Sequence, residues 1–226
     1  MKENSNLIKN IIFDWSGVIS DSIKIHYFIV NNIFEKFGAK KISFEELRRE
    51  WEQPYMHFYN KYLPKLTREE EKIAYETFLS KYPIPKLYPG VVDLLRKFKK
   101  KGVNMIVMSS DPAEKIFFNI MKYNLKGIFK EIYFEIYDKT KVTSEIIKQN
   151  QFNPRETIFI GDTIHDIEAG KSAKIKTAGV TWGLHSKEKL CLANPDFIVH
   201  DLKELESVIF KKVKSIKNLN EDYETK

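Results

Sequence analysis

Cysteine and long apolar runs are both scarce in this sequence. Cys191 is the only cysteine, so an intrachain disulfide is excluded, and no local nucleophile signature surrounds this residue. The longest apolar runs, 11–13 and 105–108, are much shorter than the roughly 20 residues of a membrane-spanning helix. The first residues, 1–4, lack the apolar core of a signal peptide. These absences predict a cytoplasmic protein that is not inserted in a membrane.

A concentration of charge of one sign is also missing. The net charge is +7, from 38 lysines and arginines against 31 aspartates and glutamates. The basic residues are spread through helical patterns, and the densest clusters, 99–101 and 211–214, are typical of solvated helix faces. This distribution does not indicate nucleic-acid binding. A modest positive field would instead attract an anionic substrate. Nothing in the sequence indicates the oligomeric state.

Strand and helix patterns alternate along most of the chain. The hydrophobic fraction is 42%, which is enough for a substantial core. Short apolar runs rich in β-branched residues predict strands at 11–15, 104–108, 131–134, 157–160, 177–181 and 197–199. Amphipathic segments predict helices at 91–101, 112–123, 144–151, 164–173 and 202–213. This alternation predicts an α/β fold, a doubly wound parallel sheet with helices on both faces.

An all-helical insertion interrupts this alternation. It ends at Pro83-Ile84-Pro85 and shows helical patterns at 23–37, 44–52, 55–62 and 68–82. We therefore predict an α/β core from residues 1–20 and 86–216, a helical cap from 21–85, and a disordered polar tail from 217–226. The aromatic residues of the cap favour a small core of its own. Arg48 and Arg49 could bind a second anionic group of a substrate or lie on a solvated helix face.

Acidic residues directly follow two of the predicted strands. Asp14 comes after the run 11–13, and Asp162 comes after the run 158–160 and one glycine. Because ligands of open α/β sheets bind outside the carboxyl ends of the strands, the two carboxylates are expected to converge. Asp166 follows four residues after Asp162 and adds another hard oxygen ligand of the kind that suits Mg²⁺. The pattern predicts a site for a metal ion and a phosphate group.

Two further polar residues fit such a site. Ser109 follows the strand 104–108, at a helix start whose hydroxyl and free N–H groups could hold a phosphoryl oxygen. Lys141 precedes the helix expected at 144–151. A lysine in that place can neutralise a nucleophilic carboxylate and a phosphate together.

These segments, in this order and spacing, resemble the haloacid dehalogenase superfamily of hydrolases over nearly the whole chain. Asp14-Trp15-Ser16-Gly17 is similar to the nucleophile loop of that family, Ser109 to its second-motif hydroxyl, and Lys141 to its third-motif lysine. Residues 161–170 resemble its acidic fourth motif. Further similarity at 88–91, 179–183 and 194–197 is to the phosphoglycolate phosphatase branch.

The resemblance implies a Rossmann-like core with a helical cap and hydrolysis of a small phosphorylated substrate. Asp14 would attack phosphorus and form an aspartyl phosphate, while Ser109 and Lys141 would hold the phosphoryl oxygens. It also implies Mg²⁺, bound by Asp14, Asp162 and the backbone carbonyl of Ser16. Asp166 would complete the metal shell through water or orient Lys141.

Ser16 departs from the phosphatase pattern, in which an aspartate at this position exchanges protons with the leaving alcohol and with water. Serine cannot do so at neutral pH, and such proton transfer typically contributes about 10²–10⁴ in rate. Three alternatives follow. The protein could be a phosphatase that is slow, restricted to good leaving groups or supplied with another carboxylate. It could cleave a phosphonate, because Asp14-Trp15-Ser16-Gly17 also resembles the start of phosphonoacetaldehyde hydrolase. That resemblance implies a cap lysine that forms a Schiff base with the substrate, and the candidates are Lys36, Lys40, Lys41, Lys61 and Lys65. It could be a regulatory protein that has lost turnover.

Overall fold

A single parallel sheet forms the centre of the molecule. The computed structural model describes residues 7–210, and no helix in that range is long and apolar enough to span a bilayer. The strands are β1 (Asn10–Phe13), β2 (Asn104–Met108), β3 (Glu131–Tyr133), β4 (Thr157–Gly161), β5 (Lys176–Val180) and β6 (Phe197–Val199). Their order is β3-β2-β1-β4-β5-β6, and every neighbouring pair is parallel. The predicted doubly wound α/β fold is confirmed.

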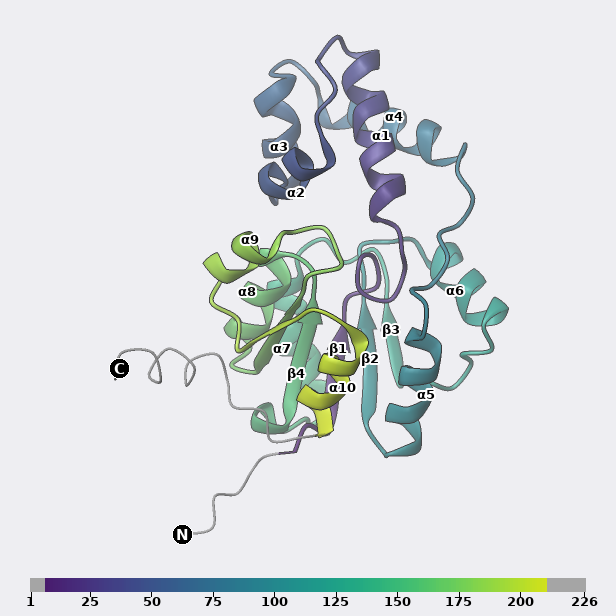
Figure 1. The fold of residues 1–226 in the computed structure, drawn as a ribbon, viewed down its shortest axis with the longest axis vertical. Coiled ribbons are helices and arrows are strands. Elements are labelled where there is room, and N and C mark those ends of the chain that lie inside the picture. The colour runs from purple at the N-terminus through teal and green to yellow at the C-terminus, as the bar shows by residue number, and fades with distance from the viewer. Residues whose placement is uncertain (1–6, 211–226) are drawn as a thin grey trace.

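Helices cover both faces of the sheet (Figure 1). They are α5 (Val91–Lys100), α6 (Ala113–Lys122), α7 (Lys139–Gln149), α8 (Ile164–Ser172), α9 (Lys187–Leu192) and α10 (Leu202–Phe210). Because successive side chains of a strand point to opposite faces, Ile11 and Phe13 pack with α5, α6 and α10, whereas Ile12 packs with α7 and α8. Alternate residues of each continuous apolar run therefore contribute to two hydrophobic cores, one on each face of the sheet.

The start of α7 differs from the sequence-based prediction. The helix begins at Lys139, five residues before the predicted start, and the side chain of Asp138 accepts a hydrogen bond from the backbone N–H of Thr140. The apolar periodicity is weak in this first turn, where the β-branched Thr140 is a poor helix former. Asp138 is a good capping residue. The capping hydrogen bond of Asp138, and not the apolar pattern, determines where helix α7 begins.

Four helices between β1 and α5 lie beyond one end of the sheet (Figure 1). They are α1 (Ile23–Lys36), α2 (Phe44–Glu50), α3 (Tyr55–Tyr62) and α4 (Arg68–Leu79). Buried aromatic side chains, among them Trp51, Phe58 and Tyr59, form a core of their own there. We call residues 21–85 the cap. Its exact boundaries stay a prediction, as do those of the α/β core, and the predicted tail lies outside the described residues.

The two chain segments that connect the cap to the sheet run side by side. The backbone N–H of Asp21 donates to the carbonyl of Lys86 at 2.8 Å, and that of Tyr88 donates to the carbonyl of Ile19 at 3.0 Å. A tight turn after β1 brings the chain to this point, because the N–H of Ser20 donates to the carbonyl of Trp15. The cap is thus held above the carboxyl ends of the strands.

Candidate active site

The strand order reverses between β1 and β4, and the acidic residues meet at this point. Phe13 of β1 is paired with Ile160 of β4, so Asp14 and Asp162 follow two adjacent strands at the same edge. Together with Asp166 at the start of α8, they place one carboxylate oxygen each within 4.8 Å of one another. A crevice outside the carboxyl ends at such a switch point is the usual ligand site of doubly wound sheets.

A buried lysine joins two of these carboxylates, but it is not the predicted one. The ammonium group of Lys139 lies 2.8 Å from Oδ1 of Asp14 and 2.7 Å from Oδ1 of Asp166. Lys141 is exposed, and the structure brings Lys139, not Lys141, to these carboxylates. Residues two apart on a helix point in roughly opposite directions, and α7 begins early enough to include both lysines. The first residue of α7 therefore faces the site, and Lys141 faces water.

The charges at the site do not balance without a further cation. Asp14, Asp162 and Asp166 are all buried, and Lys139 is the buried cation among them. Burial raises the pKa of Asp14 to about 7, and burial together with the charges of Asp14 and Asp166 raises the pKa of Asp162 well above its usual value. Such an excess of buried negative charge is costly. A divalent cation would offset it, and the hard oxygen donors fit Mg²⁺.

Hydrogen bonds leave only some of the carboxylate oxygens available to a metal ion. Both oxygens of Asp166 are engaged, Oδ1 by Lys139 and Oδ2 by the backbone N–H and hydroxyl of Thr163. Oδ1 of Asp14 accepts from Lys139 and from the N–H of Trp15. Among the described residues, none donates to Oδ2 of Asp14. This arrangement favours Asp166 as the residue that orients the lysine.

Asp162 is fixed from two sides by close backbone contacts. Its Oδ2 accepts a hydrogen bond of 2.7 Å from the N–H of Leu184, and no described residue donates to its Oδ1. Gly17 has φ +78°, and a Cβ added to it would lie 1.9 Å from Oδ2 of Asp162. Only glycine fits this close approach. The turn after β1 therefore packs directly on the aspartate after β4.

The two serines predicted for the site are linked by a carboxylate that the sequence analysis did not single out. The hydroxyl of Ser16 donates to Oδ2 of Asp111, and the hydroxyl of Ser109 donates to the same oxygen at 3.2 Å. The backbone N–H of Asp111 donates back to Ser109. This side-chain link connects the loop after β1 with the loop after β2. The ligand role of the Ser16 carbonyl stays a prediction.

Arg48 connects the cap to the loop that holds Asp162. Its guanidinium donates to three backbone carbonyls, those of Thr181 at 2.9 Å, Leu184 at 3.0 Å and His185 at 3.0 Å. Leu184 is the residue whose N–H binds Asp162. The guanidinium of Arg48, which is half-buried, is thus engaged by backbone carbonyls of the α/β core. It ties the position of the cap to that of the loop 181–185.

We expect Arg48→Met to loosen this loop. Hydrogen bonds to charged donors contribute about 1.5–3 kcal/mol each, and loss of three should speed hydrogen exchange of the Leu184 amide by about tenfold or more. Arg49→Met is the matched control, because the Arg49 side chain is exposed and, within residues 7–210, pairs only with its neighbour Glu50. Equal exchange in both variants, measured by mass spectrometry of peptides covering 181–185, would contradict the proposed connection.

Sequence reasoning missed Lys139 and Asp111, each of which had a local signal, and it missed the role of Arg48 in contacting the loop 181–185. Asp138 is a typical N-terminal capping residue and directly precedes Lys139. This signal would have placed the start of α7 at Lys139. Asp111 follows Ser109 by two residues, within the helix start already expected to hold a phosphoryl oxygen. Arg48 carried no such signal, because its partners lie more than 130 residues away along the chain.

Comparisons with known proteins show what the chain is similar to. The family described as haloacid dehalogenase-like hydrolase matches residues 11–180. Phosphoglycolate phosphatase from Synechococcus elongatus is 23% identical over 86% of this chain and 94% of that protein. Pyrophosphatase PpaX from Oceanobacillus iheyensis is 21% identical over 89% and 97%. The crystal structure of a predicted phosphatase from Clostridium acetobutylicum has a TM-score of 0.74 at 22% identity and covers 90% of this chain and 98% of that one.

Proposed function

The chain belongs to the haloacid dehalogenase-like hydrolases and is a phosphatase-type hydrolase, and from this premise we propose that it hydrolyses small phosphorylated metabolites through a phosphoryl group carried on Asp14. The observation that carries the proposal is the position of the Asp14 carboxylate. It lies at the carboxyl end of β1, bound on one oxygen by Lys139, with Asp162 beside it on the neighbouring strand. The other oxygen of Asp14 remains available for bond formation.

In the first half of the reaction, Asp14 attacks phosphorus and the bond to the leaving oxygen breaks. Lys139 neutralises charge on Asp14 and is itself oriented by Asp166. Burial opposes the charge of Lys139, but the carboxylates of Asp14 and Asp166 outweigh it and raise the pKa of the lysine. The ammonium group therefore stays protonated at neutral pH. Ser109 would hold a non-bridging phosphoryl oxygen.

We propose that Asp162, whose Oδ1 accepts no hydrogen bond from a described residue, binds the metal ion together with Asp14, whose Oδ2 is kept for the bond to phosphorus. When bound, Mg²⁺ offsets the charge that develops on the phosphoryl oxygens. In the second half of the reaction, water attacks phosphorus, the bond to Asp14 breaks, and inorganic phosphate is released. The cap would exclude bulk water during both halves.

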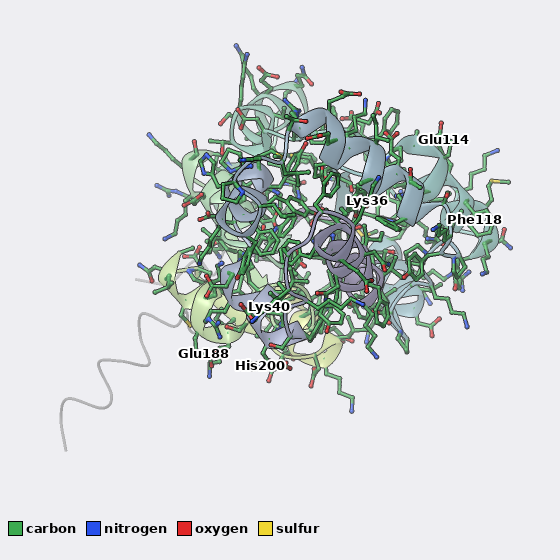
Figure 2. The ribbon with its side chains drawn as sticks, turned by 90° about the horizontal axis from the view of Figure 1, so that it is seen from above. Lys36, Lys40, Glu114, Phe118, Glu188 and His200 are labelled. Carbon is green, nitrogen blue, oxygen red and sulfur yellow. The ribbon has the colours of Figure 1, made fainter. Side chains whose placement is uncertain are left out.

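Phosphonate cleavage receives no support from the cap lysines. A Schiff-base mechanism needs a lysine that faces the site. The candidates in the cap, Lys36, Lys40, Lys41, Lys61 and Lys65, are all exposed. Lys36 is the last residue of α1, and Figure 1 shows that this end of the helix lies away from the sheet. Figure 2, which views the molecule from above the cap, labels Lys36 and Lys40. The resemblance of 14–17 to phosphonoacetaldehyde hydrolase is not confirmed.

Hydrolysis of 4-nitrophenyl phosphate tests the proposed function. We expect turnover with Mg²⁺ and a loss of at least about 100-fold after treatment with EDTA, restored by added Mg²⁺, because the carboxylates would otherwise repel the phosphate. Phosphoglycolate, pyrophosphate and a phosphonate should be compared under the same conditions. Turnover that is insensitive to EDTA, or limited to the phosphonate, would contradict the proposal.

A further inference from the structure

We propose that Asp111 is the catalytic residue that exchanges a proton with the leaving-group oxygen and with the attacking water. This inference rests on the proposed function and assigns a step that Ser16 cannot perform. It requires that the carboxyl group of Asp111 reach the place left by the short side chain at position 16. It also requires that one oxygen of that carboxyl group be free of other close partners.

The position of Asp111 meets the first requirement. Its Oδ2 accepts hydrogen bonds from the hydroxyls of both Ser16 and Ser109, which belong to the loops after the neighbouring strands β1 and β2. Ser16 and Asp111 are 95 residues apart in sequence, and they meet because β1 and β2 are neighbours. The carboxyl group thus lies directly beyond the Ser16 hydroxyl, at the site where the chain lacks an acid.

The cap, which would contact the leaving part of a substrate, comes within electrostatic range of Asp111. Burial and then the charge of Asp111 raise the pKa of Tyr75, a residue of α4 in the cap. Tyr75 in turn lies 3.3 Å from Nδ1 of His26 on α1. Asp111 is therefore placed between the loops expected to hold the phosphoryl group and the cap expected to contact the rest of the substrate.

Beyond the two serine hydroxyls on Oδ2, the carboxyl group of Asp111 has little structural role, and its Oδ1 has no close partner among the described residues. Helix α6 begins two residues later, yet no side chain caps its N-terminus. Lys115 approaches Oδ1 of Asp111 only to 3.9 Å, on a partly exposed surface, where an ion pair contributes little. The other carboxylates at the site are engaged, Asp166 by Lys139 and Thr163, and Asp162 by Leu184.

The proposed step balances in both halves of the reaction. As an Asp14 oxygen bonds to phosphorus, the ester P–O bond breaks, and its electron pair leaves with the alkoxide oxygen, which takes the proton of the Asp111 carboxyl group. The Asp111 carboxylate then removes a proton from water as the water oxygen bonds to phosphorus. The bond between phosphorus and Asp14 breaks, which restores the carboxylate of Asp14 and the protonated Asp111.

The test compares substrates that differ in their need for a proton. Asp111→Asn should lower kcat/KM for phosphoglycolate, whose alkoxide is a poor leaving group, by about 10²–10⁴-fold. It should lower kcat/KM for 4-nitrophenyl phosphate by less than about tenfold, since nitrophenolate leaves without a proton. A plot of log kcat against leaving-group pKa should become steeper.

Two further variants locate the effect at this carboxyl group. Glu114→Gln makes the same chemical change three residues later, and Figure 2 shows Glu114 at the rim of the molecule, where its side chain is exposed. This variant should change neither activity. Ser16→Asp combined with Asp111→Asn returns a carboxyl group to the site and should raise phosphoglycolate turnover at least tenfold above that of Asp111→Asn alone.

The outcomes separate this inference from the proposed function. Equal losses for both substrates, or no loss for either, would overturn the role of Asp111. Asp111→Glu keeps a carboxyl group and should retain more phosphoglycolate turnover than the asparagine variant, and equal turnover of the two would also overturn the role. The proposed function itself is contradicted by a different result, namely a wild-type protein with no Mg²⁺-dependent hydrolysis of 4-nitrophenyl phosphate.

Discussion

Replacing Asp14 by asparagine is expected to abolish hydrolysis of both aryl and alkyl phosphates, with a loss of about 10⁴-fold or more in kcat. Removing a nucleophile typically eliminates most of the acceleration by the groups that act with it. The amide keeps the shape of the carboxylate but cannot form the phosphoryl ester. The loss should therefore be independent of the leaving group, unlike that expected for Asp111→Asn.

The same change should leave the fold intact. Asp14 is buried, and burial raises its pKa to about 7, so the native structure disfavours its charge. Lys139 keeps Asp166 as a partner at 2.7 Å when Asp14 becomes neutral. Asp93→Asn, an exposed change on α5, is the control for kinetics and for unfolding in urea. Substantial turnover by a folded Asp14→Asn variant would remove Asp14 as the nucleophile.

Lys139→Met is expected to affect both stability and activity, whereas Lys141→Met should affect neither. Lys139 is the buried cation among three buried carboxylates, and breaking a buried ion pair by removing one partner costs about 3–5 kcal/mol. Lys141 is exposed in the same helical turn, where most substitutions change stability by less than about 0.5 kcal/mol.

Urea unfolding without metal and phosphate turnover with Mg²⁺ measure the two effects of the lysine substitutions. Stability should fall in Lys139→Met because Asp14 and Asp166 lose the ammonium group between them. Turnover should fall because the phosphoryl group and Asp14 would repel each other. The opposite ranking, with Lys141→Met the more damaging variant, would restore the lysine predicted from sequence and refute the structural assignment.

Local sequence order was enough to predict the acidic part of the site. Asp14 and Asp162 each follow an apolar strand directly, and parallel strands place their carboxyl ends at one edge of a sheet. The structure brings both together with Asp166. The same apolar alternation predicted every strand, with end shifts of at most two residues. These features depend on side-chain periodicity, which is visible along the chain.

The lysine and the linking carboxylate depend on features that periodicity does not show. The direction of Lys139 follows from where α7 starts, and a difference of two residues turns a side chain from the site to water. The role of Asp111 depends on its hydrogen bond with Ser16, which lies on another loop. The role of Arg48 depends on its hydrogen bonds to backbone carbonyls of the loop 181–185. The short helix α9 was also missed, since its six residues show less than two turns of pattern.

The most direct measurement of the central claim is mass spectrometry of the enzyme quenched in acid during turnover of 4-nitrophenyl phosphate with Mg²⁺. An acyl phosphate on Asp14, in the loop after β1, is the intermediate that distinguishes attack by Asp14 from direct attack by water. We expect a peptide containing Asp14 to carry the mass of one phosphoryl group, and the Asp14→Asn protein to carry none. A phosphoryl group on another residue, or its absence during rapid turnover across all quench times, would contradict the account.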